Sequence, residues 1–250
     1  PTTFEDALAV LRSRHVAREL PKIAAHLQRG QRGEIEETPK PGDECFAGVR
    51  QRVIANHETA VRAAAAALTA WGIEVLEQRC GVIGESVDVG RAMARRAIRT
   101  EGREARIGRQ GSSTEARAWV WGGETSVTVG DATGLGGPSQ ELALAAFDEI
   151  RSARVRGELP IKSADRVGIL TFSTDGIDGP TNSAGAMLLP GDLGRAEKIG
   201  IEVSAALRRH DSNTALKAMG ALLMTGPTGT NVNHVAVLVV YPAAFGNVGI

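Results

Sequence analysis

Two aspartates, Asp175 and Asp178, are separated by two residues in the loop TDGIDG. Each is followed directly by a glycine, Gly176 or Gly179. The loop follows the apolar run 167–172, which is typical of a strand buried on both faces. In sheets of parallel strands, ligands collect just beyond the carboxyl ends of the strands. A pair of carboxylates there could hold a magnesium ion or orient a reacting hydroxyl. The alternative is that both carboxylates cap backbone amides in tight turns.

Three other stretches offer groups that suit an oxygen-rich ligand. Glu124 follows a glycine pair and precedes a strand-like run at 125–129. The glycine-rich turn 130–137 leads into a helix from about Pro138, and a helix N-terminus attracts anions. The loop 225–233, TGPTGTNVN, offers amides, hydroxyls and carboxamides without charge. For both glycine-containing segments, an ordinary connection between elements is the alternative.

The short signatures of nucleotide binding do not occur in this sequence. Neither GxGxxG nor GxxxxGK[ST] is present. The histidines His15, His26, His57, His210 and His234 show no spacing typical of a metal site or a catalytic triad. Any chemistry is therefore predicted to depend on carboxylates, amides and hydroxyls.

The composition predicts a folded protein with one large domain or two smaller ones. Of the 250 residues, 42% are hydrophobic and 23% are charged. Lys+Arg and Asp+Glu both total 29, so a basic nucleic-acid surface is not indicated. Apolar runs are too short to cross a membrane, and no signal-peptide pattern occurs. Cys45 and Cys80 lack metal-ligand spacing, which predicts free thiols in a cytoplasmic protein.

The elements that position these residues begin with two predicted helices within residues 2–29. Thr2 and Glu5 have the spacing of a capping box at the start of the first helix. The segment 28–44 is almost entirely polar, which predicts a solvated loop or a linker.

A strand, a helix and a second strand are predicted next. The strands are expected at 53–55 and 73–76, with Gly72 ending the helix between them. Such short connections imply a crossover and a parallel sheet. Asn56 would then lie at the carboxyl end of the first strand, where it either contacts a ligand or forms a turn.

An amphipathic helix at about 85–100 is predicted to precede a polar, aperiodic joint at 101–117. The elements predicted after that joint are a helix from about 138, a buried strand at 167–172, short helices at 192–200 and 202–209, a helix ending at 220, and a last strand at 235–241.

Four stretches together resemble the carboxy-terminal domain of the glycerate 2-kinase family, which is called the MOFRL domain. They are GGETSVTV at 122–129, GLGGPSQELALA at 134–145, TDGIDGPTNSAGA at 174–186 and TGPTGTNVN at 225–233. PTTFEDALAVL, GEIEETPKPGD and the Asn56 strand resemble the segment that completes the first domain of that family. The resemblance covers nearly the whole chain, and the combination is far more specific than any single motif. Some members of the family are described as hydroxypyruvate reductases.

The resemblance implies an α/β protein with two lobes. These are an incomplete Rossmann-like amino-terminal portion and a carboxy-terminal α/β/α three-layer domain with a mixed sheet. On this basis residues 1–101 are the remainder of the first domain, 102–117 are the joint, and 118–250 are the MOFRL-like domain. Family proteins are longer, and their Rossmann-like region carries a lysine thought to act in catalysis. The chain is therefore expected to be an amino-terminally truncated kinase or a partial record of one.

The resemblance also implies ATP-dependent phosphorylation of D-glycerate to 2-phosphoglycerate, with ATP and Mg²⁺ bound in a cleft between the domains. Asp175 and Asp178 would serve the magnesium–phosphate cluster or the attacking hydroxyl. Glu124 would orient a metal-bound water or a substrate hydroxyl. The residues expected to bind substrate or phosphate are Asn56, Gly136, Gly137, Gln140, Glu141, Thr228, Gly229, Thr230 and Asn231.

The expected partners are glycerate and a nucleotide, without nucleic acid or membrane, and a homodimer is among the open oligomeric states. Many relatives carry an arginine in GGRNQE where this chain has Pro138. A phosphate-neutralising arginine is therefore missing at that position. Two alternatives stay open: an NAD(P)H-dependent hydroxypyruvate reductase and a non-catalytic ligand-binding remnant.

Overall fold

The computed structural model describes residues 2–106 and 116–242, which fall into two units. The first unit is Pro1–Val53 and the second is Ile54–Ile250. The sequence placed a division at 102–117, a segment that lies mostly outside the described residues. The structure divides the chain at a different position because the elements on either side of that segment share one sheet.

The first unit contains two helices that pack against each other, α1 (Phe4–Ser13) and α2 (Pro21–Gln31), followed by the short 3₁₀ helix η1 (Glu44–Phe46). Within α1 only Leu8 is buried, and within α2 only Ala24 is buried. The apolar interior of this unit is therefore small, and polar contacts hold much of it together.

The capping box of α1 lies one residue later than the sequence predicted. The amide of Asp6 donates to the Thr3 hydroxyl at 3.1 Å, and the Asp6 carboxylate accepts from the Thr3 amide at 2.8 Å. The predicted pair was Thr2 and Glu5. The helix begins where a reciprocal pair of hydrogen bonds can form, and Asp6 supplies the returning carboxylate.

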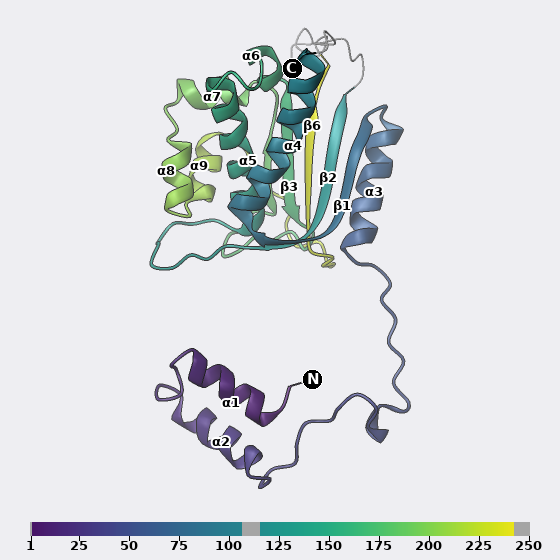
Figure 1. Cartoon of the computed structure of the whole chain (residues 1–250), viewed down its shortest axis with the longest axis vertical. Helices are drawn as coiled ribbons and strands as arrows, with labels where there is room; N and C mark the ends of the chain where they lie inside the picture. The colour runs from purple at the N-terminus through teal and green to yellow at the C-terminus, as the bar shows by residue number, and fades with distance from the viewer. Residues whose placement is uncertain (1, 107–115, 243–250) are drawn as a thin grey trace. The chain divides into compact units, whose positions relative to one another are not determined.

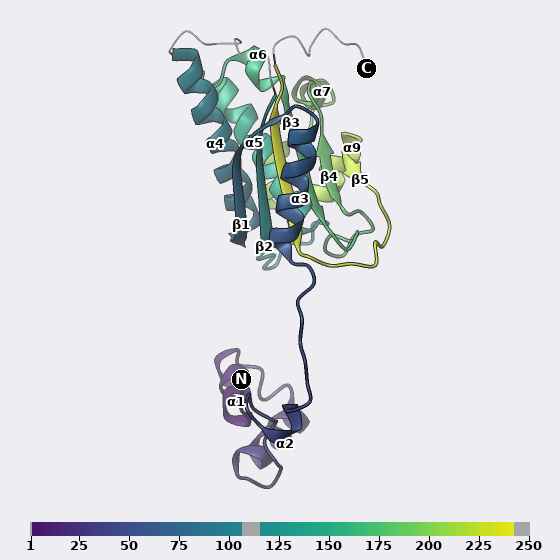
Figure 2. The same cartoon turned by 90° about the vertical axis from the view of Figure 1, so that its right-hand side faces the viewer.

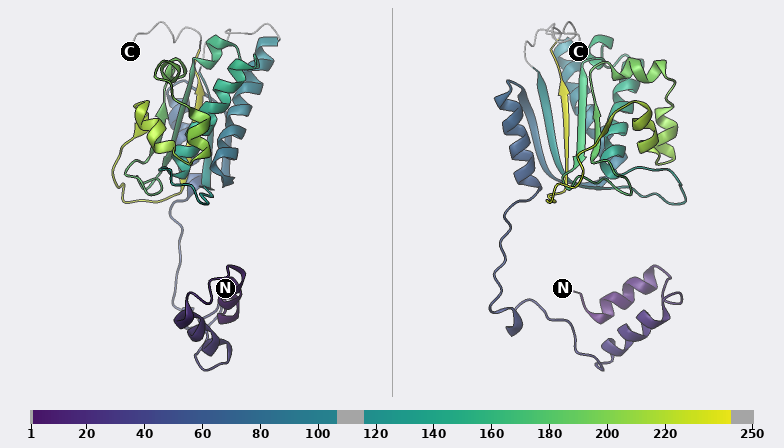
Figure 3. Two further views of the ribbon diagram at one scale, coloured as in Figure 1. Left: turned by 90° about the vertical axis from the view of Figure 1, so that its left-hand side faces the viewer. Right: turned by 180° about the vertical axis from the view of Figure 1, so that it is seen from behind.

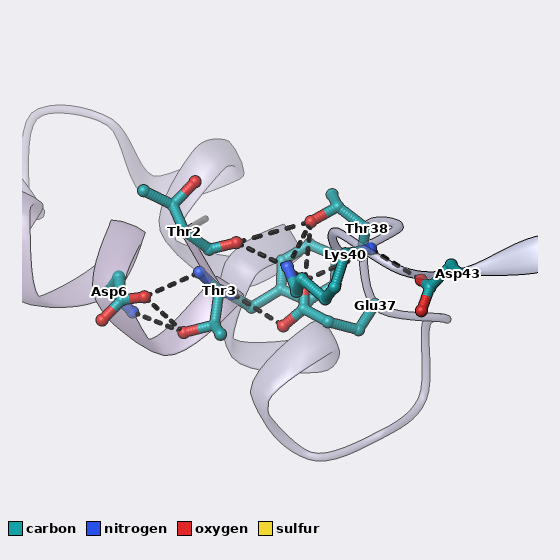
Figure 4. A network of polar contacts seen from close by, with 8 residues as sticks. Thr2, Thr3, Asp6, Glu37, Thr38, Lys40 and Asp43 are labelled. Atoms are coloured by element: carbon teal, nitrogen blue, oxygen red, sulfur yellow. Dashed lines mark hydrogen bonds and ion pairs between the residues drawn. The ribbon is translucent and has the colours of Figure 1, made fainter. Parts of the chain in front are cut away.

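A polar network ties residues after α2 to the start of α1, as Figure 4 shows. The Glu37 carboxylate accepts from the Phe4 amide at 3.0 Å. The Lys40 ammonium donates to the Thr2 carbonyl at 2.6 Å and to the Thr38 hydroxyl at 2.7 Å. Exposed contacts of this kind each contribute little to stability, so this unit depends on several of them together.

The described part of the second unit forms a six-stranded sheet in the order β1-β2-β6-β3-β4-β5 (Figure 1). β1 and β2 are parallel, and the other neighbouring strands are antiparallel. This mixed sheet with its helices confirms the predicted α/β class. The strands are β1 (Glu74–Glu85), β2 (Arg117–Ser126), β3 (Val167–Ser173), β4 (Gly185–Leu188), β5 (Leu222–Leu223) and β6 (His234–Val240).

Helices cover both faces of the sheet. Figure 1 shows α4 and α5 in front of the strands, and the right-hand view of Figure 3 shows them behind. α3 lies on the opposite face, where its Val61 packs with Val235 and Val237 of β6. Alternate residues of β6, such as Leu238, pack on the α5 side. The helices of the second unit are α3 (His57–Ala70), α4 (Ser86–Arg106), α5 (Pro138–Val155), α6 (Ile161–Ala164), α7 (Asp192–Lys198), α8 (Val203–Arg208) and α9 (Ser212–Ala218).

α5 is the central helix of this unit. Most of its residues are buried, including Leu144 and Ile150, because the helix contacts α4, α8, α9 and the sheet. This explains why its sequence is apolar on more than one side. The first turn of α5 is consequently fixed in position beside the loops that follow β3.

The strand predicted at 53–55 is not a strand in the structure. Asn56 is instead the N-cap of α3, and its side-chain oxygen accepts from the Thr59 amide at 3.1 Å. The parallel strand–helix–strand unit is β1-α4-β2, and α4 extends into the predicted joint as far as Arg106. The capping box formed by Asn56 and Thr59 therefore begins a helix at this point, and the short apolar run before it does not form a strand.

No helix among the described residues is long and apolar enough to cross a membrane. Cys45 and Cys80 are both exposed free cysteines, as the sequence predicted.

Candidate functional site

Residues from several distant segments line one pocket at the end of the sheet where β3 ends and β6 begins. The loops after β3 and before β6 lie at this same end in Figure 2. The pocket measures about 450 Å³, and it brings together Glu124, Asp175 and Asn231 from the predicted set. The lining residues are Glu124, Thr125, Pro138, Ser173, Asp175, Ile177, Gly179, Asn231, Asn233 and His234.

A chain of side-chain amides connects the two carboxylates of this pocket. The Asn233 side-chain amide donates to Glu124 Oε2 at 2.9 Å. The Asn233 backbone amide donates to Asn231 Oδ1 at 3.0 Å, and Asn231 Nδ2 donates to Asp175 Oδ2 at 3.3 Å. The loop before β6 therefore sets the positions of Glu124 and Asp175 relative to each other.

Asp175 is held in its ionised form at the edge of the pocket. Its Oδ1 accepts from the Ile177 amide at 3.0 Å and from the Ser173 hydroxyl at 2.7 Å. These two hydrogen bonds, the Ile177 amide first, lower the pKa of Asp175 below its ordinary value. An ionised carboxylate that borders a pocket can bind a cation or accept a hydrogen bond from a ligand hydroxyl.

Asp178 has a different environment, because it is only 1% exposed. Its carboxylate accepts from the Ser139 amide, the Gln140 amide and Gln140 Nε2, each at 2.9 Å. Burial raises the pKa of Asp178, against the opposing effect of the hydrogen bonds from Gln140 and Ser139. Of the two interpretations of this carboxylate, the structure shows the capping one.

The N-terminus of α5 consequently holds the protein's own carboxylate. A Cβ on Gly137, the N-cap of α5, would lie 2.4 Å from the Asp178 carboxylate carbon, so Asp178 fills the space beside this turn. Gly136 is equally enclosed, since its Cβ would lie 2.2 Å from the Ser212 hydroxyl. The sequence suggested that the Gly136–Gly137 turn offers amides to a phosphate, but the first amides of α5 already bind Asp178.

Gln140 and Glu141 were expected to reach the ligand, but both are buried behind the pocket. Gln140 Oε1 accepts from Asn213 Nδ2 at 2.7 Å, which links α5 to α9. The Glu141 carboxylate lies 2.9 Å from His210 Nδ1. Burial raises the pKa of Glu141, and the His210 contact opposes this effect. Neither side chain lines the pocket.

The loop 225–233 uses most of its polar groups to bind neighbouring backbone. The Thr228 amide donates to the Asp175 carbonyl at 3.0 Å, and the Thr228 hydroxyl donates to the Thr174 carbonyl at 2.6 Å. The Thr230 amide is bonded to the Thr228 hydroxyl at 3.4 Å. Thr228 therefore holds this loop against the aspartate loop, whereas Asn231 lines the pocket and Gly229 and Thr230 do not.

Two glycines bring these loops into direct contact. A Cβ on Gly176 would lie 2.0 Å from the Gly226 carbonyl oxygen, so no side chain fits at that position. Gly176 and Gly226 both have positive φ, at 89° and 69°, which favours glycine. The close approach places the Asp175 loop directly beside the loop that carries Asn231.

Two further predictions about this site differ from the structure. Asn56 caps α3 and does not line the pocket. β3 is antiparallel to both neighbours, β4 and β6, so the rule about carboxyl ends of parallel strands does not apply to it. Asn233, which the sequence offers only as one of the carboxamides of the loop 225–233, and His234, which it does not propose, also line the pocket. Asn233 has a φ of 69°, a left-handed conformation that asparagine tolerates, so an Asn at a strand start was the available signal.

The donor set of the pocket suits a hard cation that also binds phosphate. In the part of the chain that the structure describes, no group of three or more His, Cys, Asp or Glu side chains could hold a metal ion. Glu124 and Asp175 provide two carboxylates at one pocket. Magnesium is commonly held by one or two carboxylates together with substrate phosphates, so the ionised Asp175 carboxylate fits that mode of binding.

Comparison with known proteins gives similarity along most of the chain. The MOFRL family matches residues 117–234. A glycerate 2-kinase of Pyrococcus horikoshii is 35% identical over 242 residues, which are 96% of this chain and 50% of that protein. A putative hydroxypyruvate reductase of Agrobacterium vitis is 35% identical over 243 residues, 96% of this chain and 49% of that protein. The chain thus spans about half the length of these relatives.

Solved structures show the same fold. The crystal structure of a glycerate kinase from Thermotoga maritima matches with a TM-score of 0.67 and 29% identity, over 96% of this chain and 50% of that one. A Pyrococcus horikoshii protein matches with a TM-score of 0.62 and 34% identity, over 97% of this chain and 51% of that one.

Proposed function

We propose that this chain, which belongs to the glycerate 2-kinase family and carries its MOFRL domain at residues 117–234, takes part in the phosphorylation of D-glycerate. In that reaction the γ-phosphoryl group of ATP passes to the 2-hydroxyl of D-glycerate, which gives 2-phosphoglycerate and ADP. The observation that carries the proposal is the amide chain connecting Glu124 with Asp175 across one pocket. Phosphoryl transfer depends mainly on positioning and charge neutralisation, and this arrangement provides positioned charge.

Asp175 is assigned the contact with the reacting groups. Its Oδ1 is occupied by Ile177 and Ser173, while Oδ2 lies on the side of Asn231 in the pocket. Glu124 lies at the other end of the amide chain and orients a substrate hydroxyl or a bound water. Asp178 is assigned a positioning role, because its carboxylate fixes the loop to the start of α5. This revises the pairing of Asp175 with Asp178 as metal ligands.

Asp175 would hold the magnesium ion of the reaction, and Glu124 would orient a water bound to that ion. Bound there, the ion would neutralise charge on the phosphate oxygens. The pocket residues that the structure describes include neither lysine nor arginine, and Pro138 lies at the rim where many relatives have an arginine. Positive charge at this pocket is therefore assigned to the metal ion and to groups supplied from outside these residues.

The direct test is formation of 2-phosphoglycerate from ATP, Mg²⁺ and D-glycerate, together with calorimetric binding of D-glycerate. Asp175→Asn should lower turnover roughly a hundredfold, because the charge at the reacting groups is lost. The thermal midpoint should change little, since the amide and hydroxyl donors around Asp175 keep an acceptor. Asp131→Asn, at an exposed aspartate outside this pocket, is the matched control. Unchanged turnover in Asp175→Asn would contradict the assignment.

The similarity to proteins named putative hydroxypyruvate reductases supports one rival function. In that case the chain would consume NADH in the presence of hydroxypyruvate, and the loss of NADH absorbance would report it. Oxidation of NADH that is insensitive to Asp175→Asn would favour the reductase. Phosphate transfer that depends on Asp175, without NADH oxidation, would favour the kinase.

A further inference from the structure

Trp121 and His234 are diagonal neighbours on one face of the sheet. His234, the first residue of β6, lies opposite Gly123 of β2 and opposite Ser173 of β3. Trp121 lies opposite Ala236, so both rings project toward the side of α4 and α5. Diagonal pairs of this kind are within reach of aromatic side chains.

Each of these rings has a buried polar atom that lacks a partner. Trp121 Nε1 and His234 Nδ1 are both buried and accept or donate no hydrogen bond among the residues that the structure describes. Trp121 is only 2% exposed, and the Arg79 guanidinium stacks 4.9 Å from its ring centre, so the indole is fixed in place. Buried polar atoms without a hydrogen-bond partner are uncommon in proteins, so two of them on neighbouring rings are unusual.

Both rings line the same small cavity. The cavity measures about 10 Å³, at the lower end of the roughly 10–15 Å³ that one water molecule needs. Gly122 and Gly123 form part of its wall, and a Cβ on Gly123 would lie 2.1 Å from the Val82 carbonyl oxygen. The glycine opposite His234 therefore lets the backbone of β2 approach Val82 of β1 closely at this cavity. His234 also lines the larger pocket with Asp175 and Glu124, so this residue borders both spaces.

We propose that one buried water occupies this cavity, accepts from Trp121 Nε1, and donates to His234 Nδ1, so that His234 presents Nε2–H to the pocket beside Asp175. An indole nitrogen can only donate, and a water can donate and accept at once. With Nδ1 accepting from the water, the proton of the neutral imidazole resides on Nε2. The carboxylates of the pocket favour a donor on that side of the ring.

The consequence is a further positioning role at the proposed active site. His234 Nε2–H would donate to an anionic oxygen of the ligand, a carboxylate or a phosphate oxygen, at a pocket that otherwise carries acidic and amide groups. Trp121 would act through the water by fixing the tautomer of His234. This ligand contact rests on the proposed function, whereas the water and the tautomer do not.

The tautomer is measured by the ring ¹⁵N shifts of His234 in the whole chain, at a pH where the ring is neutral. The expected result is a proton on Nε2, and a dominant Nδ1–H form would overturn the proposal. Trp121→Phe removes the indole donor, and the preference for Nε2–H should fall roughly five- to tenfold. Trp71→Phe, at a tryptophan that is 76% exposed, is the matched control and should change nothing. An unchanged tautomer preference in Trp121→Phe would overturn the proposed water bridge between Trp121 and His234.

A second measurement needs no core substitution. Magnetisation transfer from the Trp121 indole proton to a long-lived water in the unaltered protein supports the bridging water, and a dry cavity overturns it. Titration with D-glycerate then tests the ligand contact: a shift of the His234 Nε2–H signal supports it, and binding that leaves this signal unmoved overturns it. Absence of any glycerate binding would refute the proposed function, while the tautomer measurement would still decide the status of the water.

Discussion

Asp178 and Asp175 come from the same short loop, yet one is enclosed by the start of α5 and the other borders an open pocket. Asp178 accepts from two backbone amides of the helix and from Gln140, whereas Asp175 accepts from its own loop and from Asn231. The comparison shows that neighbouring donors decide what each carboxylate does. A helix end holds Asp178, and the absence of such an end beside Asp175 leaves one of its oxygens facing the pocket.

The largest expected effect is a loss of stability on substitution of Asp178, the buried aspartate. Asp178→Ala should lower the free energy of unfolding by about 3 kcal/mol, because buried amides of Ser139 and Gln140 lose their acceptor. Urea denaturation measures this change. Asp175→Ala serves as the comparison and should cost less than about 1 kcal/mol, since its donors lie nearer to water. Equal losses for the two variants would contradict the division between a structural and a ligand-facing carboxylate.

The next effect is on activity at the pocket side. Glu124→Gln should lower the turnover of D-glycerate roughly tenfold or more, because one of the two carboxylates of the pocket loses its charge. Its stability should change little, since Asn233 can still donate to the carboxamide oxygen. Steady-state kinetics and a thermal melt measure both. Asp131→Asn again provides the matched removal of an exposed charge, and a parallel loss of activity in that variant would reject the assignment.

The two aspartates should also respond to pH with opposite sign. The pKa of Asp175 is lowered from 3.8, so its contribution to stability is present above that pH and is lost as the pH falls through the folded-state value. The pKa of Asp178 is raised from 3.8, so its contribution declines as the pH rises through the window just above that value.

Urea denaturation across this acidic range tests the difference. The stability of the unaltered chain relative to Asp175→Asn should increase with pH, and its stability relative to Asp178→Asn should decrease. The same trend for both variants would show that the two carboxylates titrate alike. Salt should be kept constant, since the exposed ion pairs of the first unit respond to screening.

The smallest effect is expected at the amide chain. Asn231→Ala removes one donor to Asp175 at 3.3 Å and the acceptor for the Asn233 amide, and it should cost less than about 1 kcal/mol. Denaturation measures this loss, and Asn213→Ala provides the buried counterpart because it removes the donor to Gln140. A larger loss of unfolding free energy in Asn231→Ala than in Asn213→Ala would contradict the conclusion that the buried contacts around α5 stabilise the fold more than those at the pocket.

Much of the fold could be predicted from the pattern of apolar residues and from the glycines and prolines that end helices and strands. The apolar run before Asp175 forms β3, the continuous apolar run after His234 forms most of β6, and the mixed α/β class is confirmed. The strand at 53–55 was wrong, because a short apolar run cannot reveal that Asn56 and Thr59 start a helix there. The extent of α4 was also underestimated, since its polar last turns lack the apolar periodicity on which the prediction depended.

The site could be predicted only at the level of loops. Asp175 and Asp178 lie in a nearly repeated sequence, so no local pattern distinguishes the carboxylate that meets α5 from the one at the pocket. That difference depends on how the first turn of α5 packs on the loop. His234 has neither the spacing of a metal site nor that of a catalytic triad, so its sequence context does not mark it as a site residue. Its position follows from strand register, which a sequence does not display.

The contact between Gly176 and Gly226 has a mechanical consequence. With the Thr228 amide bound to the Asp175 carbonyl, the loops after β3 and before β6 are joined at two points. A displacement of either loop would carry the other, so the floor of the pocket shifts as one rigid piece. A ligand bound in this pocket would thus meet two loops that move together.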